Sequence, residues 1–228
     1  MEIDKHTLLF RAAVKEAIAW SGIVKGAWVL DVGVGRLGIS SRVLSALGAK
    51  AVCLDTDGDK AGSIDRRAIF HKGDIRKTKW PDGEFDAVTS VLTLHELPEA
   101  DHPRALKEMM RLARRVVIVE KTPATEDATG ALQMAWRMAM DSLGRTEQPR
   151  PPLYWFRRVD ELRPARVRCR FVKFSKREEM EHFRGKLEEI KLHWREQGVP
   201  GAIVESLDAI QVDGNVEMPP FFVIVADF

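Results

Sequence analysis

The sequence is poor in cysteine and lacks long apolar runs. Its two cysteines, Cys53 and Cys169, lie in apolar segments typical of strands, so we expect two buried thiols and neither a disulfide framework nor a zinc site. A membrane-spanning helix needs about 20 apolar residues in a row, and the apolar segments here are shorter. Residues 1–6 also lack the basic flank and apolar core of a secretory signal. We therefore expect a cytoplasmic protein with no membrane partner.

Charge of one sign is not in excess either. Lysine and arginine number 36 against 34 aspartate and glutamate, which gives a net charge of +2. This balance alone does not indicate a polyanionic partner, although local clusters of charge can still bind one. The chain of 228 residues is 45% hydrophobic and shows no internal repeat or low-complexity tract. These properties are typical of one globular domain with a substantial core.

Short apolar runs alternate with helical segments along the first half of the chain. Runs rich in valine and isoleucine predict strands at 28–32, 51–55, 68–71, 85–90 and 116–120, and later at 165–174 and 221–226. Periodicity and turn residues predict helices at 7–21, 39–47, about 58–64, 101–112, 124–143, about 159–162 and 176–197. This alternation is typical of an α/β fold in which helices cover a parallel sheet.

The most informative segment is 28–40, where an apolar strand runs into a glycine turn. Gly33 and Gly35 lack a Cβ, so they can adopt positive φ and let a ligand approach the main chain. The helix predicted from Ile39 points its N-terminus at the same place. With Gly38, these glycines also match the G-x-G-x-x-G dinucleotide fingerprint, and Asp55 stands about 20 residues further on. A dehydrogenase is therefore one interpretation of the turn.

Asp31, two residues before the first glycine, favours a different ligand. A carboxylate there can accept hydrogen bonds from the turn amides or reach an amino group of the ligand. The pyrophosphate of a dinucleotide is anionic and gains nothing from this neighbour, whereas S-adenosylmethionine (SAM) carries an ammonium and a sulfonium. Segment 29–35 resembles the first motif of the class I SAM-dependent methyltransferases, and segments 51–57, 72–75, 85–97 and 116–120 resemble the later strands of that family's small-molecule branch.

The resemblance implies which residues hold the cofactor. Asp55 matches the acid that holds the ribose hydroxyls, Asp74 matches the acceptor of the adenine amino group, and Ile75 is implied to pack near the base. The full implied set is Asp31, Gly33, Val34, Gly35, Asp55, Thr56, Asp74, Ile75 and Val91. One departure is that the family places a third glycine at the position of Leu37, whereas this chain has it at Gly38.

The resemblance also implies the architecture. We expect a Rossmann-like α/β fold with a seven-stranded, mostly parallel sheet, helices on both faces, and an antiparallel last strand. Residues 1–228 are expected to form a single methyltransferase domain with an N-terminal helical segment over 1–23. Segments 122–156 and 175–220 are expected to be insertions on the substrate side of the sheet, because they follow the strands of the cofactor core.

Methyl transfer from a sulfonium is an in-line displacement, so positioning and exclusion of water supply much of the catalysis. A general base is needed only if the nucleophile must lose a proton early. His95 is the candidate base and Glu120 a candidate second polar group, although an ordinary structural role is open for both. Asp86 begins its strand and is expected to be structural. No metal site is predicted, because no cluster of residues has the spacing of metal ligands.

We therefore predict a SAM-dependent methyltransferase that acts on a small molecule and releases S-adenosylhomocysteine (SAH). One alternative is an RNA or protein methyltransferase that uses the arginine run within 157–170, which otherwise reads as the solvated face of an edge strand. A second alternative is a non-enzymatic module that binds SAM or SAH. A nucleic-acid partner is not favoured, and the sequence names neither the acceptor atom nor the oligomeric state.

Overall fold

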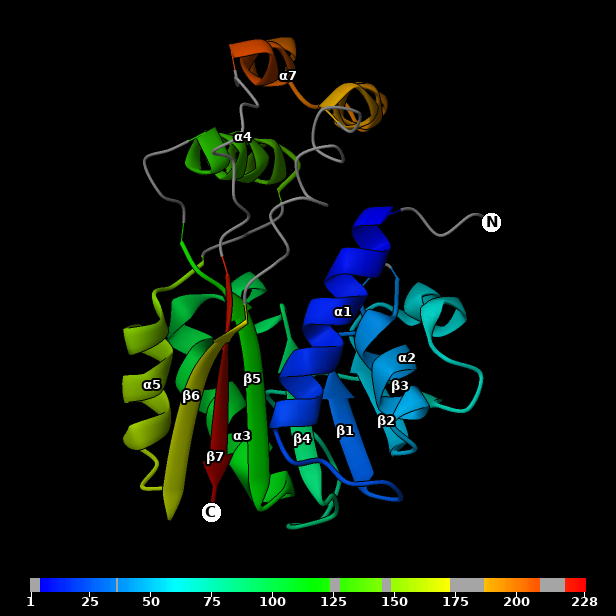
Figure 1. The fold of residues 1–228 in the computed structure, drawn as a ribbon, viewed down its shortest axis with the longest axis vertical. Coiled ribbons are helices and arrows are strands. Elements are labelled where there is room, and N and C mark those ends of the chain that lie inside the picture. The colour runs from blue at the N-terminus through cyan, green and yellow to red at the C-terminus, as the bar shows by residue number, and fades with distance from the viewer. Residues whose placement is uncertain (1–4, 36, 124–127, 145–148, 173–186, 210–219) are drawn as a thin grey trace.

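A computed structural model describes residues 5–35, 37–123, 128–144, 149–172, 187–209 and 220–228. The strands of its single seven-stranded sheet are β1 (Trp28–Val32), β2 (Lys50–Asp55), β3 (Ile69–Lys72), β4 (Ala87–Val91), β5 (Arg115–Lys121), β6 (Arg166–Val172) and β7 (Phe221–Asp227). The spatial order is β3-β2-β1-β4-β5-β7-β6, and β7 runs antiparallel to both of its neighbours. The predicted Rossmann-like fold with an antiparallel last strand is confirmed (Figure 1).

Helices cover both faces of this sheet. The α-helices include α1 (Lys5–Trp20), α2 (Ile39–Ala46), α3 (His102–Leu112), α4 (Ala128–Ser142), α5 (Pro152–Asp160) and α7 (Gly201–Glu205). Short 3₁₀ turns are η1 (Gly58–Ser63), η2 (Leu94–Glu96), η3 (Glu99–Asp101) and η4 (Ser206–Ala209). Figure 1 shows α1 in front of the strands, on the face that it shares with α2, while α3 and α5 cover the opposite face.

The two faces of the sheet carry separate hydrophobic cores because side chains alternate along each strand. In β1, Val29 packs with α1 and α2, whereas Leu30 packs with α3 and α5. In β5, Val117 likewise belongs to the core on the α1 and α2 face, and Ile118 belongs to the core on the α3 and α5 face. Strands buried on both faces read as continuous apolar runs, which is why the sequence predicts their positions to within two residues.

The edge strand β6 corrects one prediction. Arg168 lies over the ring of Trp20, 5.0 Å from its centroid, and Arg170 forms an ion pair with Glu16, so the predicted arginine face turns towards α1. On the other face Cys169 is exposed, whereas Cys53 in β2 is fully buried. The expectation of two buried thiols is therefore wrong for Cys169, because an edge strand has a neighbour on one side alone and its outer face is incompletely covered.

The helix near 159–162 is also placed differently. The prolines at 149–152 suggested a loop, but α5 begins at Pro152, in the first turn where proline is well tolerated. Its buried residues Trp155 and Val159 are spaced by one turn and face the sheet. The segment predicted as a helix at 58–64 is the 3₁₀ turn η1. Predicted positions at 1–4, 124–127, 176–186 and 210–219 lie outside the described residues.

A third hydrophobic cluster lies apart from the sheet. It joins α4, the helix at 187–196 and α7, with Ala139, Trp194 and Val204 at its centre. Figure 1 shows α4 and α7 beyond the end of the sheet at which the parallel strands finish, which is the ligand-binding edge in such folds. None of the helices in the described part of the chain is both long and apolar enough to cross a bilayer.

The burial of the two thiols predicts their reactivity. Cys169 should react with Ellman's reagent in the native protein, while Cys53 should react only after unfolding, because burial raises the pKa of the Cys53 thiol and blocks access to it. We expect one fast thiol in buffer, two in guanidinium chloride, and none in native Cys169→Ser. Two fast thiols in the native wild type would contradict this placement.

Candidate functional site

The glycine turn after β1 is held in a left-handed backbone. Gly33, Gly35 and Gly38 have φ values of 79°, 61° and 55°, a region that side chains disfavour. The N–H of Gly33 donates to the carbonyl oxygen of Leu54 at 2.9 Å, which joins the turn to the end of β2. The turn therefore lies at the carboxyl end of the central parallel strands, as the sequence predicts.

The three glycines are required for different reasons. A Cβ on Gly33 would lie 2.1 Å from Oγ1 of Thr93, and one on Gly38 would lie 2.2 Å from the carbonyl oxygen of Ser63. At Gly35, apart from its chain neighbours, no heavy atom of the described residues comes within 4 Å of an added Cβ. Packing thus excludes a side chain at Gly33 and Gly38, whereas the backbone at Gly35 is open to a ligand.

Gly38 departs from the family pattern by one residue, and the structure gives it a place at the start of α2. It is the N-cap of that helix, and its carbonyl oxygen accepts from the hydroxyl of Ser41 at 2.8 Å. The close approach of Ser63 leaves room for a glycine at this point and for no larger residue. Gly38 therefore fixes how α2 meets the turn.

Asp55 ends β2 and is oriented by two backbone amides. Its Oδ2 accepts from the N–H of Val34 at 2.9 Å, and its Oδ1 accepts from the N–H of Asp57 at 2.9 Å. The sequence suggests that Asp31 can accept a hydrogen bond from a turn amide. In the structure it is Asp55 that accepts from a turn amide, that of Val34. Each carboxylate oxygen has a second lone pair, so Asp55 can still accept from the hydroxyls of a ligand. Thr56, beside it, is exposed.

Asp31 is fully buried beneath the turn. Its carboxylate accepts from the hydroxyl of Ser40 at 2.6 Å and from that of Thr89 at 3.0 Å. Burial raises the pKa of Asp31 from its ordinary value to about 6, and the two hydroxyl donors oppose this shift. Asp31 thus ties β1 to β4 and to the first turn of α2, and its contact with a ligand stays a prediction.

Asp74 follows β3 and is engaged by a residue that sequence reasoning missed. The backbone N–H and the guanidinium of Arg76 both donate to its carboxylate, the shortest bond being 2.7 Å from Nη2 to Oδ2. These hydrogen bonds lower the pKa of Asp74, so the group is an anion at neutral pH. Arg76 also reaches Asp101 at 2.5 Å. Ile75, which lies between Asp74 and Arg76 in the chain, is buried.

His95 and Glu120 form a buried pair at the ends of β4 and β5. Nδ1 of His95 lies 2.6 Å from Oε2 of Glu120, and the backbone N–H of His95 donates to Oε1 at 3.3 Å. The exposed fractions of the two residues are 2% and 0%. The sequence placed both groups at this edge but gave no sign of their pairing. Asp86, by contrast, accepts from the N–H of Trp28 at 2.7 Å, so its predicted structural role is confirmed.

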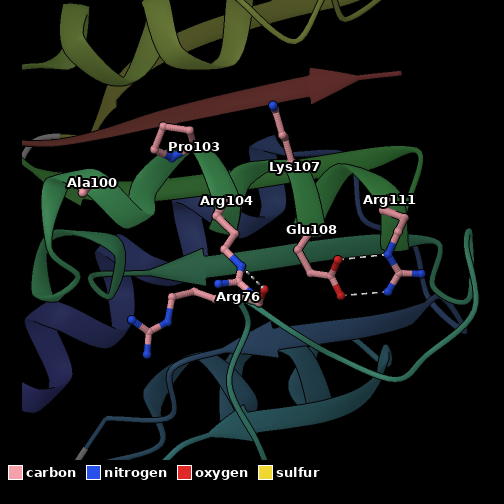
Figure 2. Close-up of a pocket in the computed structure, with 7 residues that line it drawn as sticks. All are labelled: Arg76, Ala100, Pro103, Arg104, Lys107, Glu108 and Arg111. Carbon is pink, nitrogen blue, oxygen red and sulfur yellow. Dashed lines mark hydrogen bonds and ion pairs between the residues drawn. The ribbon is translucent and has the colours of Figure 1, made fainter.

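A shallow groove of about 490 Å³ runs along α3, away from the glycine turn, and its lining includes none of the residues predicted to bind the cofactor. Figure 2 shows Glu108 and Arg111 paired in it, with Arg76, Arg104 and Lys107 alongside. Both Arg76 and Arg111 contact two acidic side chains each. The acidic partners offset the charges of Arg76 and Arg111, so these two arginines are less available to a polyanion.

Comparisons with known proteins identify methyltransferases as relatives of this chain. Residues 30–118 match the sequence profile of a methyltransferase domain family. The chain is 32% identical over 133 residues to demethylmenaquinone methyltransferase of Deinococcus radiodurans, covering 54% of this chain and 53% of that protein. It is 29% identical over 133 residues to the chloroplastic 2-phytyl-1,4-beta-naphthoquinone methyltransferase of Arabidopsis thaliana, covering 51% and 50%. The chain thus spans about half the length of these curated relatives.

The fold also matches a solved structure over nearly its whole length. A SAM-dependent methyltransferase from Archaeoglobus fulgidus superposes with a TM-score of 0.64 at 17% identity, covering 97% of this chain and 94% of that one. At this identity the likeness establishes the fold alone. The family resemblance inferred from the motifs is confirmed by the domain match over residues 30–118.

The packing around the turn predicts losses of stability of different size for two alanine substitutions. Gly38→Ala should lower the free energy of unfolding by about 2–4 kcal/mol, because its Cβ meets a backbone carbonyl in addition to the left-handed strain. Gly35→Ala should cost about 1–2 kcal/mol, from backbone strain alone. Urea unfolding of both variants measures this difference, and equal losses would contradict the packing described.

The burial of Asp31 predicts a pH-dependent stability. Its pKa is raised from 3.8 to about 6 in the folded protein, so between these values the folded state binds more protons than the unfolded chain. Stability from this group therefore falls as the pH rises through that window. Relative to Asp31→Asn, the wild type should lose about 2–3 kcal/mol of unfolding free energy between about pH 4 and pH 7. Urea unfolding of both proteins at several pH values tests this. A free energy of unfolding of the wild type that rises with pH relative to that of Asp31→Asn would contradict it.

Proposed function

We propose, from the match of residues 30–118 to a methyltransferase domain family, that the protein is an enzyme that transfers the methyl group of SAM to a small molecule. The observation that carries this proposal is the open backbone at Gly35 beside the fixed carboxylate of Asp55. A Cβ at Gly35 would project into this open space, where a ligand could lie against the main chain. Asp55 can then accept from two vicinal hydroxyls.

The other predicted residues complete this assignment. The backbone of Gly33, Val34 and Gly35 would lie along the methionine and ribose parts of SAM, with Thr56 next to the ribose. Asp74 and Ile75 would receive the adenine, since an ionised carboxylate accepts from an amino group and an isoleucine packs on a ring face. Bound SAM supplies an electrophilic methyl group on a sulfonium. The chain's own task is to hold the acceptor in line with that group and to exclude water.

The acceptor is proposed to be a small aromatic molecule of the quinone type. Both curated relatives are named as methyltransferases of quinones. In this chain α4 lies beyond the ligand edge of the sheet and carries Trp136 and the exposed side chains of Met134 and Met138, which suit an apolar aromatic ligand. The segments 122–156 and 175–220 are proposed to form the acceptor side of the site, and the cytoplasm is proposed as the protein's location.

The structure gives the RNA alternative little support. Arg158, Arg168 and Arg170 contact Glu161, Trp20 and Glu16 respectively, so these members of the arginine run have partners within the chain. A polyanion would have to compete with each of these contacts, and affinity for nucleic acid depends on free cationic groups. A small-molecule acceptor requires no such surface.

Calorimetry with SAH tests the proposal through Asp55. Asp55→Ala should weaken SAH binding by about 10- to 100-fold, because it removes the charged acceptor for two hydroxyls. The matched control is Asp57→Ala, which removes an exposed carboxylate from the same loop and should change the affinity by less than about threefold. NADH in a parallel titration should not bind.

The same preparation of the protein is then assayed for methyl transfer. Methyl transfer from labelled SAM to a panel of reduced quinones should give a methylated product with the wild type. If neither SAM nor SAH bound the wild type, the proposal would be wrong. If both bound but no methyl group moved to any small molecule, RNA or protein on the panel, the non-enzymatic alternative would replace it.

A further inference from the structure

The segment that links β4 to η2 has an unusual backbone. Leu92 has a φ of 53°, a left-handed conformation that a leucine adopts only where its surroundings hold it. Its N–H donates to the carbonyl oxygen of Val119 at 2.8 Å, so the segment is fixed on β5 at this point. Strain of this kind gathers at functional sites, and here it stands next to the glycine turn.

A second attachment to β5 follows three residues later. Glu120 accepts from both the backbone N–H and the ring of His95, at 3.3 Å and 2.6 Å. In the tautomer that carries a proton on Nδ1, the ring of His95 donates to Oε2 of Glu120. Both groups are almost completely buried, where removing one partner leaves the other without compensation. Glu120 thereby fixes the backbone and the side chain of His95 together.

Thr93 lies between these two attachments and touches the glycine turn. A Cβ on Gly33 would overlap both Oγ1 and Cγ2 of Thr93, at 2.1 Å and 2.3 Å, so the threonine side chain occupies the space that Gly33 leaves empty. Its hydroxyl donates to the carbonyl oxygen of Val91 at 3.1 Å, which fixes its rotamer. The position of segment 91–95 therefore determines where the side chain of Thr93 packs against Gly33.

We propose that Glu120 is a positioning residue for cofactor binding: through His95 it holds segment 91–95 so that Thr93 supports Gly33 in its ligand-accepting conformation. This inference rests on the proposed function, and it gives His95 a role other than proton transfer. The imidazole is buried and bound to Glu120, and the positioning role requires no contact between the ring and an acceptor. Glu120 itself does not need to touch the ligand.

The test measures the dissociation constant of SAH by calorimetry and thermal stability by circular dichroism. Glu120→Gln and His95→Ala should each weaken SAH binding by about tenfold, and the double variant should bind no more weakly than either single one, because both break the same link. His95→Asn should retain the wild-type affinity within about threefold, because the amide of asparagine can donate to Glu120 in place of Nδ1–H.

The matched control is Glu108→Gln in the α3 groove. Glu108 also accepts from a backbone N–H, that of Thr78 at 3.0 Å, and from an arginine, as Figure 2 shows. This substitution should lower the thermal stability and leave the SAH affinity unchanged. A purely structural role for Glu120 would give the same pattern in Glu120→Gln, with lower stability and unchanged affinity, and would overturn the inference.

Thr93→Ala probes the other end of the link without touching the buried pair. It should weaken SAH binding by about five- to tenfold, and it decides the question if Glu120→Gln and His95→Ala do not fold. Unchanged affinity in folded Thr93→Ala would overturn the inference while the wild type still bound SAH. If the wild type itself bound no SAH, the proposed function would fail and this inference with it.

Discussion

The left-handed glycine turn after β1 is the constraint on which the rest of the site depends. It is closely packed on two sides, since Thr93 occupies the space beside Gly33 and the carbonyl of Ser63 occupies the space beside Gly38. Between these contacts Gly35 remains open. Contacts of this kind support the turn before a ligand binds, and a site formed before binding loses little free energy to ordering. The surrounding residues are best understood by how they hold this turn.

Four acidic residues lie at or near the ends of strands around this turn, and each has a different environment. Asp31 is fully buried, which raises its pKa to about 6 although two hydroxyl donors oppose the shift. Asp55 is partly exposed and held by backbone amides, whereas Asp74 is held by Arg76. Glu120, near the end of β5, is paired with the buried His95. Only Asp55 and Asp74 keep access to solvent, so they are the members of the set suited to direct contact with a ligand.

The sequence predicted the central strands of the sheet well because they are buried on both faces, and such strands show as uninterrupted apolar runs. It predicted the start of α5 poorly because three prolines suggested a loop, although proline is stable in the first turn of a helix. The pairings within the site could not be predicted, since they join residues far apart in the chain, such as Asp31 with Thr89 and His95 with Glu120. One signal was present: polar Thr89 interrupts the apolar strand β4, and a buried hydroxyl needs a partner.

The most direct test of the account is to locate SAH on the protein by the change in backbone amide shifts on titration. The account predicts that the largest changes occur at Gly33, Val34 and Gly35 and at the amides around Asp55 and Asp74, with the α3 groove of Figure 2 unaffected. Changes confined to the groove, or the absence of any saturable change, would contradict the assignment of the glycine turn as the cofactor site.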